Sequence, residues 1–188
     1  MQEHGDRLRR MVAFRLDPRL QGRIDAADIV QEAYLEAADH REAYFRLPPV
    51  PLFLWLRGVV GNKLLELHRH HLGAGIRDAA REEPNHRRAA PDATSISLCA
   101  QFAAHSDGPG TAAAGAEVRL RLRQALAAMD PIDREALALR HFEHLTNGEA
   151  AAVLGIQERA AAKRYVRALK RLRDILAEMP GGLSEVRP

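Results

Sequence analysis

A short helix, a glycine turn and a long basic helix near the C-terminus constrain this fold most. Thr146 and Glu149 have the spacing of a capping box, in which each side chain bonds the other residue's backbone N–H at a helix start. Gly155 stands where a glycine commonly ends a helix. The pattern predicts a helix-turn-helix. Its three expected elements are a helix over Thr146–Leu154, a turn at Gly155–Ile156 and a helix over Gln157–Leu176.

The second helix of this motif is strongly basic. Residues 155–176 carry seven basic and two acidic side chains, whereas the whole chain of 188 residues has a net charge of only +3. Such a helix suits the major groove, where cationic side chains neutralise phosphates. The candidate DNA contacts are Gln157, Glu158, Arg159, Lys163, Arg164 and Arg167, and the expected inner face is Ala161, Tyr165, Ala168, Leu169 and Leu172. A plain helical hairpin with a solvated basic face is the alternative interpretation.

The composition favours an all-α fold. Ala, Leu and Arg dominate and form helices readily, while aromatic residues make up only 5% of the chain. The single cysteine, Cys99, excludes an internal disulfide framework and a cysteine-based zinc site. No apolar run approaches the roughly 20 residues that span a bilayer, and the first residues lack the apolar region of a signal peptide. We therefore expect a cytoplasmic protein.

Glycine and proline divide the chain into two expected domains. Residues 73–116 contain eight Gly or Pro residues and little apolar periodicity, which is typical of a linker. The expected organisation is two small helical domains joined by a flexible linker. The boundaries are 1–74 for the first domain, 75–116 for the linker, 117–180 for the helix-turn-helix domain and 181–188 for a tail. Within the C-terminal domain we expect Asp130–Pro131 to end one helix and Asp133 to cap the next.

In the first domain, Asp25 is suited to cap a helix that starts at Ala26. Helical spacing places one apolar set on a single face, namely Ile29, Val30, Ala33 and Ala37. A second face is polar, with Asp28, Gln31, Glu32 and Leu35. Taken alone, this polar face is better explained as a solvated helix surface.

A second helix follows the proline-rich run Leu47–Pro51, which cannot itself be helical. Aromatic side chains beside arginine and asparagine suit the stacking and binding of unpaired bases. The residues of this kind are Phe53, Trp55, Arg57, Asn62, Lys63 and Arg69. The alternative for Trp55 is ordinary core packing.

Together and in this order, these segments resemble a bacterial RNA polymerase sigma factor of the sigma-70 family. The resemblance is to the extracytoplasmic-function group, which keeps only the second and fourth conserved regions. The stretch DIVQEAYL resembles the region-two helix that docks on the clamp helices of the polymerase β′ subunit. The residues it implies for polymerase binding are Asp28, Ile29, Gln31, Glu32 and Leu35.

The remaining segments of the resemblance concern promoter DNA. The stretch FLWLRGVVGNKLLELHR resembles the helix that melts and reads the −10 element, with its base-capturing loop at about Arg46–Leu52. The implied −10 contacts are Phe53, Trp55, Arg57, Asn62, Lys63 and Arg69. The helix-turn-helix resembles region four, which reads the −35 element and lies on the β-flap tip.

The resemblance implies a non-enzymatic protein without a cofactor or metal. Its implied partners are core RNA polymerase, promoter DNA and, as in many members, an anti-sigma factor. Two other classes stay open. One is a free-standing helix-turn-helix regulator, which binds DNA without polymerase. The other is a helical adaptor, enzyme or metal-binding protein built around His68–His71.

Overall fold

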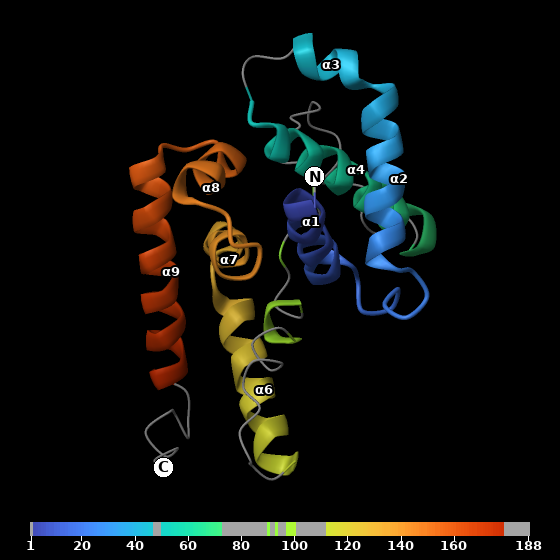
Figure 1. The fold of residues 1–188 in the computed structure, drawn as a ribbon. Coiled ribbons are helices and arrows are strands. Elements are labelled where there is room, and N and C mark those ends of the chain that lie inside the picture. Colours follow the sequence, from blue (N-terminus) through green and yellow to red (C-terminus); the bar gives the residue numbers. More distant parts are fainter. Residues whose placement is uncertain are drawn as a thin grey trace. The chain divides into compact units, whose positions relative to one another are not determined.

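The structure is a computed structural model, and it describes residues 2–46, 50–72, 90, 93, 97–100 and 112–178. Helices make up nearly all of these residues (Figure 1), which confirms the expected all-α class. The described residues contain one isolated β-bridge, between Gln21 and Ile24. None of the described helices is long and apolar enough to cross a membrane.

Internal contacts divide the chain into two compact units. The first unit comprises Met1–Pro91 with Ala151–Ile156, and the second comprises Asp92–Ala150 with Gln157–Pro188. The division falls within the helix α8 (Asn147–Leu154). Each unit has its own buried apolar residues and is described here by itself.

Four helices form most of the first unit: α1 (Gln2–Arg15), α2 (Ala26–Asp39), α3 (Arg41–Arg46) and α4 (Leu52–Leu72). The helices α1, α2 and α4 pack against one another. The predicted start of α2 is confirmed, because the Asp25 side chain accepts a hydrogen bond of 2.8 Å from the backbone N–H of Ala27. The predicted inner face is also confirmed, since all four of its residues are buried: Ile29, Val30, Ala33 and Ala37.

The second unit contains α6 (Ala112–Ala128), α7 (Pro131–Leu137), a π-helical turn η2 (Ala138–Phe142), the first turn of α8 and α9 (Glu158–Glu178). The helices α6 and α7 both pack against α9. The largest side chains that are fully buried in this unit come from several of these segments. They are Leu98, Leu126, Leu137, Leu139 and Leu145.

The start of α7 differs from the sequence prediction. Asp130, rather than Asp133, is the N-cap, and its carboxylate accepts a 2.9 Å hydrogen bond from the N–H of Ile132. Pro131 then occupies the first helical position, where its missing N–H costs no hydrogen bond. Because Asp130 caps the helix, the carboxylate of Asp133 in the first turn remains available for another partner.

Part of the segment expected to be a linker packs within the second unit. Residues 97–100 are helical, and Leu98 is completely buried. The Cys99 thiol lies 3.2 Å from the carbonyl oxygen of Arg119, and burial raises its pKa. The N–H of Ala93 donates to Glu135 at 3.1 Å. At these residues the chain therefore differs from a flexible linker, because apolar side chains spaced along it complete the core.

Candidate nucleic-acid and polymerase interfaces

The turn between α8 and α9 has the predicted local geometry. The N–H of Thr146 donates to the Glu149 carboxylate at 2.8 Å, and the N–H of Glu149 donates to the Thr146 hydroxyl at 3.1 Å. This reciprocal pair is the predicted capping box. It satisfies two backbone donors at the start of α8 and fixes where that helix begins.

Gly155 ends α8 as predicted. Its φ of +66° lies in the left-handed region that favours glycine, and the N–H of Ile156 donates to the carbonyl of Ala151 at 3.0 Å. This bond pattern is a Schellman motif. Near the start of the motif, a Cβ on Gly148 would stand 3.8 Å from the Glu158 carboxyl group. A Cβ at position 148 would therefore make an ordinary van der Waals contact with the first turn of α9.

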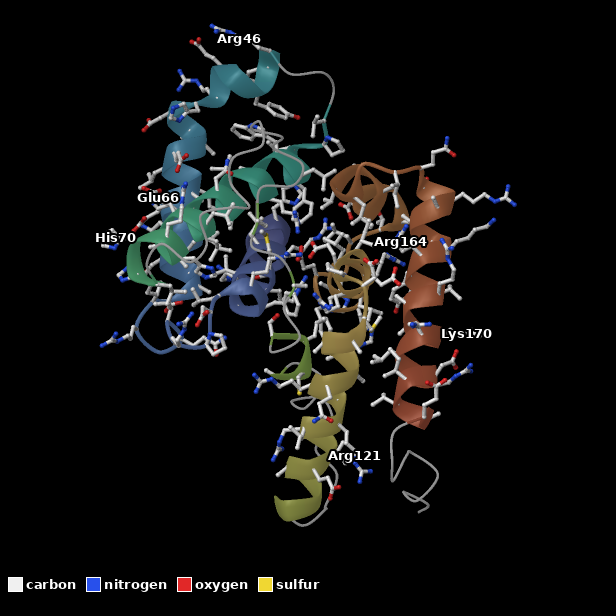
Figure 2. The ribbon with its side chains drawn as sticks, turned by 180° about the vertical axis from the view of Figure 1, so that it is seen from behind. Arg46, Glu66, His70, Arg121, Arg164 and Lys170 are labelled. Atoms are coloured by element: carbon white, nitrogen blue, oxygen red, sulfur yellow. The ribbon has the colours of Figure 1, made fainter. Side chains whose placement is uncertain are left out.

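One face of α9 is exposed and cationic. Only three of its residues are buried, Ala161, Ala168 and Leu172, and all three belong to the predicted inner face. Leu169, expected inside, is 39% exposed. Figure 2 shows Lys170 extending outward from the helix. The exposed members of the predicted DNA-binding set are Gln157, Glu158, Arg159, Lys163 and Arg167, and Lys170 and Arg171 continue this surface.

Arg164 differs from the rest of the predicted DNA-binding set. Its guanidinium donates to the Asp133 carboxylate at 3.0 Å, and both side chains are largely covered, with 29% and 21% exposed. Figure 2 shows Arg164 on α9. The arginine therefore ties α9 to α7. This position corrects the expectation that Arg164 faces DNA, and the carboxylate that Asp130 leaves available is the physical reason.

A second arginine that the sequence reasoning did not single out braces the same unit. Arg140, in the π-helical turn η2, donates to the carbonyl of Leu145 and lies 5.7 Å from the centre of the Tyr165 ring on α9. The turn is followed by His144, whose φ of 54° is unusual for a residue other than glycine. The apolar residues around Leu139 do not distinguish a π-helical turn from an ordinary helix, so the sequence could not predict the contacts that Arg140 makes from this turn.

The polar face of α2 is exposed to solvent as predicted. Its exposed residues are Asp28, Gln31, Glu32 and Leu35, and Leu35 keeps 64% of its surface exposed. Ile29, which was expected to bind polymerase, is only 2% exposed and belongs to the core. The Glu32 carboxylate pairs with Lys63 of α4 at 3.1 Å, and this hydrogen bond raises the pKa of Lys63.

The aromatic start of α4 lies in the interior, contrary to its expected role in base binding. Phe53 is 5% exposed and is covered by Arg7, whose guanidinium carbon is 3.6 Å from the ring centre. Trp55 is 6% exposed and lies against the Tyr44 ring at 5.1 Å. Arg57 is 2% exposed, and its side chain is not without a partner. Of the predicted −10 residues, only Asn62 and Arg69 are exposed, and Lys63 is half-buried and paired.

The structure exposes a different aromatic residue beside this helix. Phe45 on α3 is 79% exposed, and its ring meets Tyr44 edge-on at 5.4 Å. The Tyr44 hydroxyl donates to the carbonyl of Val50 at 3.0 Å, which connects α3 to the residues that precede α4. Sequence reasoning missed Phe45 because one aromatic residue in a six-residue helix has no periodic partner. Leu47, Pro48 and Pro49 of the predicted base-capturing loop lie outside the described residues.

The histidine run at the end of α4 does not act as one group. His68 is 6% exposed, and its Nε2 accepts a 3.2 Å hydrogen bond from the N–H of Asp17. Burial lowers the pKa of His68, so the ring is neutral at neutral pH. His70 and His71 are exposed and touch edge-on at 4.8 Å. Among the described residues no three His, Cys, Asp or Glu side chains are grouped as metal ligands.

Comparison with known proteins bears on the second unit. Residues 119–172 match the family described as sigma-70, region 4. These residues are therefore similar to a sigma-70 region 4. The match begins within α6 and runs through α7, η2 and α8 to most of α9, so the capping box and much of the cationic face of α9 lie in the matched region. The region 4 match supports sigma-factor function in promoter recognition.

Other comparisons add little. Among solved structures, the chain is similar to the sigma factor RpoE of Bartonella quintana in its complex with the anti-sigma factor NepR, with 18% identity, 95% of each chain covered and a TM-score of 0.47. A comparison with curated proteins gave no match. The region 4 match therefore carries the assignment by itself.

Proposed function

We propose that this chain is a sigma factor of the extracytoplasmic-function group, which binds core RNA polymerase and directs it to promoters. The observation that carries the proposal is the region 4 match over residues 119–172 together with the exposed cationic face of α9. In this proposal α9 lies in the major groove of the −35 element. The contacts there are made by Gln157, Glu158, Arg159, Lys163 and Arg167, while Arg164 positions α9 through Asp133.

The proposed contact with polymerase is the exposed face of α2. Asp28, Gln31 and Glu32 precede Leu35 on the same exposed face, so an apolar side chain stands beside polar and acidic ones. A surface of that kind suits a cationic helical partner, since charges steer the approach and the leucine contributes apolar burial. We assign this face to the β′ clamp helices and the region 4 domain to the β-flap.

The proposed −10 contacts come from α4 and α3. Asn62 and Arg69 remain open on α4, and Phe45 of α3 offers an exposed ring of the kind that stacks on unpaired bases. Phe53, Trp55 and Arg57 support this surface from inside. The two functions correspond to the proposed domains 1–74 and 117–180, with residues 75–116 between them and a tail at 181–188.

The proposal implies no chemistry and no cofactor of the chain's own. Affinity for promoter DNA comes from phosphate neutralisation by the cationic face and from the polymerase to which the factor is bound. The protein acts in the cytoplasm, where polymerase and promoters are, and an anti-sigma factor is a proposed partner. The net charge of +3 fits weak binding of DNA by the free chain.

The polymerase contact is testable by charge reversal on α2. Asp28→Arg combined with Leu35→Asp reverses one charge of this face and replaces its apolar side chain by a charged one, and neither side chain is buried. We expect association with core polymerase, measured by fluorescence anisotropy of the labelled chain, to weaken at least tenfold. Glu178→Arg, at an exposed acidic position at the end of α9 and outside this face, is the matched control. Unchanged affinity in the double variant, or an equal loss in the control, would contradict the assignment of this face.

A further inference from the structure

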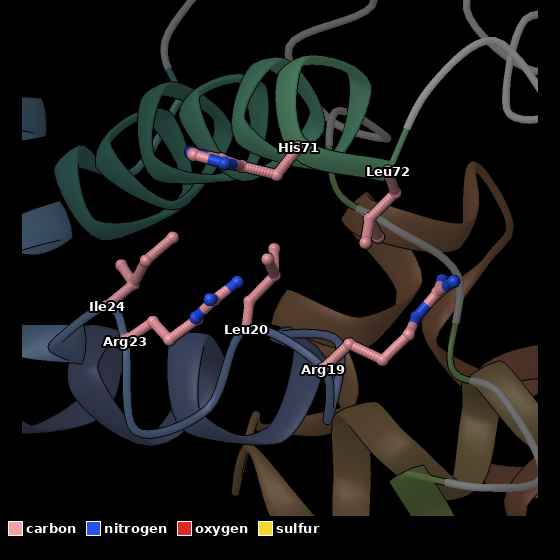
Figure 3. Close-up of a pocket in the computed structure, with 6 residues that line it drawn as sticks. All are labelled: Arg19, Leu20, Arg23, Ile24, His71 and Leu72. Carbon is pink, nitrogen blue, oxygen red and sulfur yellow. The ribbon is translucent and has the colours of Figure 1, made fainter.

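A hollow of about 530 Å³ lies in the first unit, between the loop that follows α1 and the last turn of α4. Figure 3 shows side chains from these two segments pointing toward each other across it. The lining residues are Arg19, Leu20, Arg23, Ile24, His71 and Leu72. None of them belongs to the surfaces proposed for DNA or polymerase. The volume lies within the range of small-molecule sites.

The loop that forms one wall is tightly hydrogen-bonded. The N–H groups of Leu20 and Gln21 donate to the carbonyl of Asp17, and those of Arg23 and Ile24 donate to the carbonyl of Leu20. Gly22 between them has a φ of +84°, a conformation that favours glycine. The loop is thus a built turn, and it holds Arg19 and Arg23 at fixed backbone positions.

A buried hydrogen bond fastens this loop to α4. The N–H of Asp17 donates to Nε2 of His68, one turn before His71. The Asp17 carboxylate accepts two hydrogen bonds of 2.9 Å from the Arg19 guanidinium, and this pairing lowers the pKa of Asp17. The pairing uses Nε and Nη2 of Arg19, so the remaining N–H groups of its guanidinium stay available. The two walls of the hollow are therefore fixed relative to each other before any ligand arrives.

The chemistry of the hollow is amphipathic and cationic. Leu20 is buried, Ile24 and Leu72 are half-buried, and these three side chains supply an aliphatic surface. Arg19, Arg23 and His71 are exposed and supply positive charge or N–H donors. The Arg23 guanidinium makes no ion pair or hydrogen bond with any other described residue, whereas Arg19 is partly neutralised by Asp17.

We propose that this hollow binds a small amphipathic anion, with a carboxylate or phosphate head held by Arg23 and Arg19 and a short apolar body against Leu20, Ile24 and Leu72. An arginine fork matches the oxygens of either head group. A cation would be repelled by the two arginines, and an inorganic anion would leave the aliphatic wall unused. This inference goes beyond the proposed function, and its test needs neither polymerase nor DNA.

The test is titration calorimetry of the full chain with octanoate and, separately, with octyl phosphate. Binding of either probe at a ratio of about one to one supports the proposal and identifies the preferred head group. We expect butyrate to bind at least tenfold more weakly than octanoate, because less apolar surface is buried. Octylammonium, with the same apolar body and the opposite charge, is expected not to bind.

Variants place the binding at this hollow. Arg23→Ala is expected to weaken binding of the preferred probe at least tenfold, whereas Arg10→Ala, an exposed arginine of α1 away from the hollow, keeps the parent affinity. Thermal unfolding followed by circular dichroism checks that both variants fold. The proposal is overturned if neither anion binds with a dissociation constant of about 10 millimolar or tighter, which is roughly the weakest affinity that still indicates a site. Equal weakening by both variants, or equal binding of octylammonium, also overturns it.

Discussion

The two longest helices that the structure describes, α4 and α9, each have 21 residues and are both proposed to contact DNA, yet they are built in opposite ways. Ten residues of α4 are buried, whereas only three residues of α9 are. The aromatic and cationic side chains at the start of α4 are buried in the first unit. Most cationic side chains of α9 are exposed to solvent, whereas Arg164 is paired and Tyr165 is half-buried. An arginine or aromatic residue in a DNA-binding segment is therefore no sign of DNA contact until its burial is known.

The largest expected effect tests the interior role of α4. Trp55→Ala removes a buried indole that packs against Tyr44, and large-to-small aromatic changes in a core cost about 3–5 kcal/mol of the free energy of unfolding. Val166→Ala on α9, where the side chain is 63% exposed, is expected to stay within about 0.5 kcal/mol. Urea unfolding measures both. An unchanged free energy of unfolding in Trp55→Ala would contradict the interior role of α4.

The ion pair that ties α9 to α7 is expected to have the next largest effect. Arg164→Ala leaves a largely covered carboxylate on Asp133 without its partner, at a cost of about 1–2 kcal/mol after allowance for partial exposure. A double-mutant cycle with Asp133→Ala isolates the pair, because the second change adds little once the first is made. Additive losses of stability would show that the two side chains do not interact.

The capping box of α8 predicts a smaller loss. Thr146→Ala removes the acceptor for the N–H of Glu149, and loss of such a cap costs about 1 kcal/mol. Thr146→Ser keeps the hydroxyl and is the control. Equal stability of the alanine and serine variants in urea unfolding would exclude a contribution from the cap.

The smallest expected effect concerns pH and the loop held by α4. The pKa of His68 is lower in the folded chain than in the unfolded chain, because burial disfavours its charge. As the pH falls, His68 therefore takes up a proton at a higher pH in the unfolded chain than in the folded chain. The free energy of unfolding then decreases as the pH drops below about 6.5 toward the folded pKa. His68→Gln keeps a hydrogen-bond acceptor and does not titrate, so its stability is expected to change less between pH 7 and pH 5.5. If the stability of this variant changes with pH as much as that of the unaltered chain, groups other than His68 cause the pH dependence.

The sequence predicted the local features of the fold well, and these features share one cause. The Asp25 cap, the Thr146–Glu149 box and the left-handed Gly155 depend on side chains within a few residues of the backbone groups that they satisfy. The inner faces of α2 and α9 were largely predictable for a similar reason. Each of these helices lies with one side on a core, so its apolar spacing reports its burial.

The parts that the sequence did not predict depend on contacts between distant segments. The burial of Phe53 requires Arg7 and His4 of α1, and that of Trp55 involves Tyr44 of α3. A helix covered on most sides has no continuous polar face to mark its exposed residues, so the sequence did not show that Phe53, Trp55 and Arg57 are buried as well. The Asp133–Arg164 pair joins residues that are 31 positions apart, so the sequence did not predict it. The burial of Leu98 in the expected linker likewise depends on contacts with segments that are distant in the sequence.

Run-off transcription from fragmented DNA of the source genome tests the central claim most directly, with core RNA polymerase in the presence and absence of this chain. The account predicts new discrete transcripts whose templates share a two-box motif upstream. It also predicts that Lys163→Ala combined with Arg167→Ala greatly reduces these transcripts while the stability of the chain stays within about 0.5 kcal/mol. An absence of new transcripts, with sequence-specific DNA binding by the chain alone, would contradict the account and indicate a free-standing regulator.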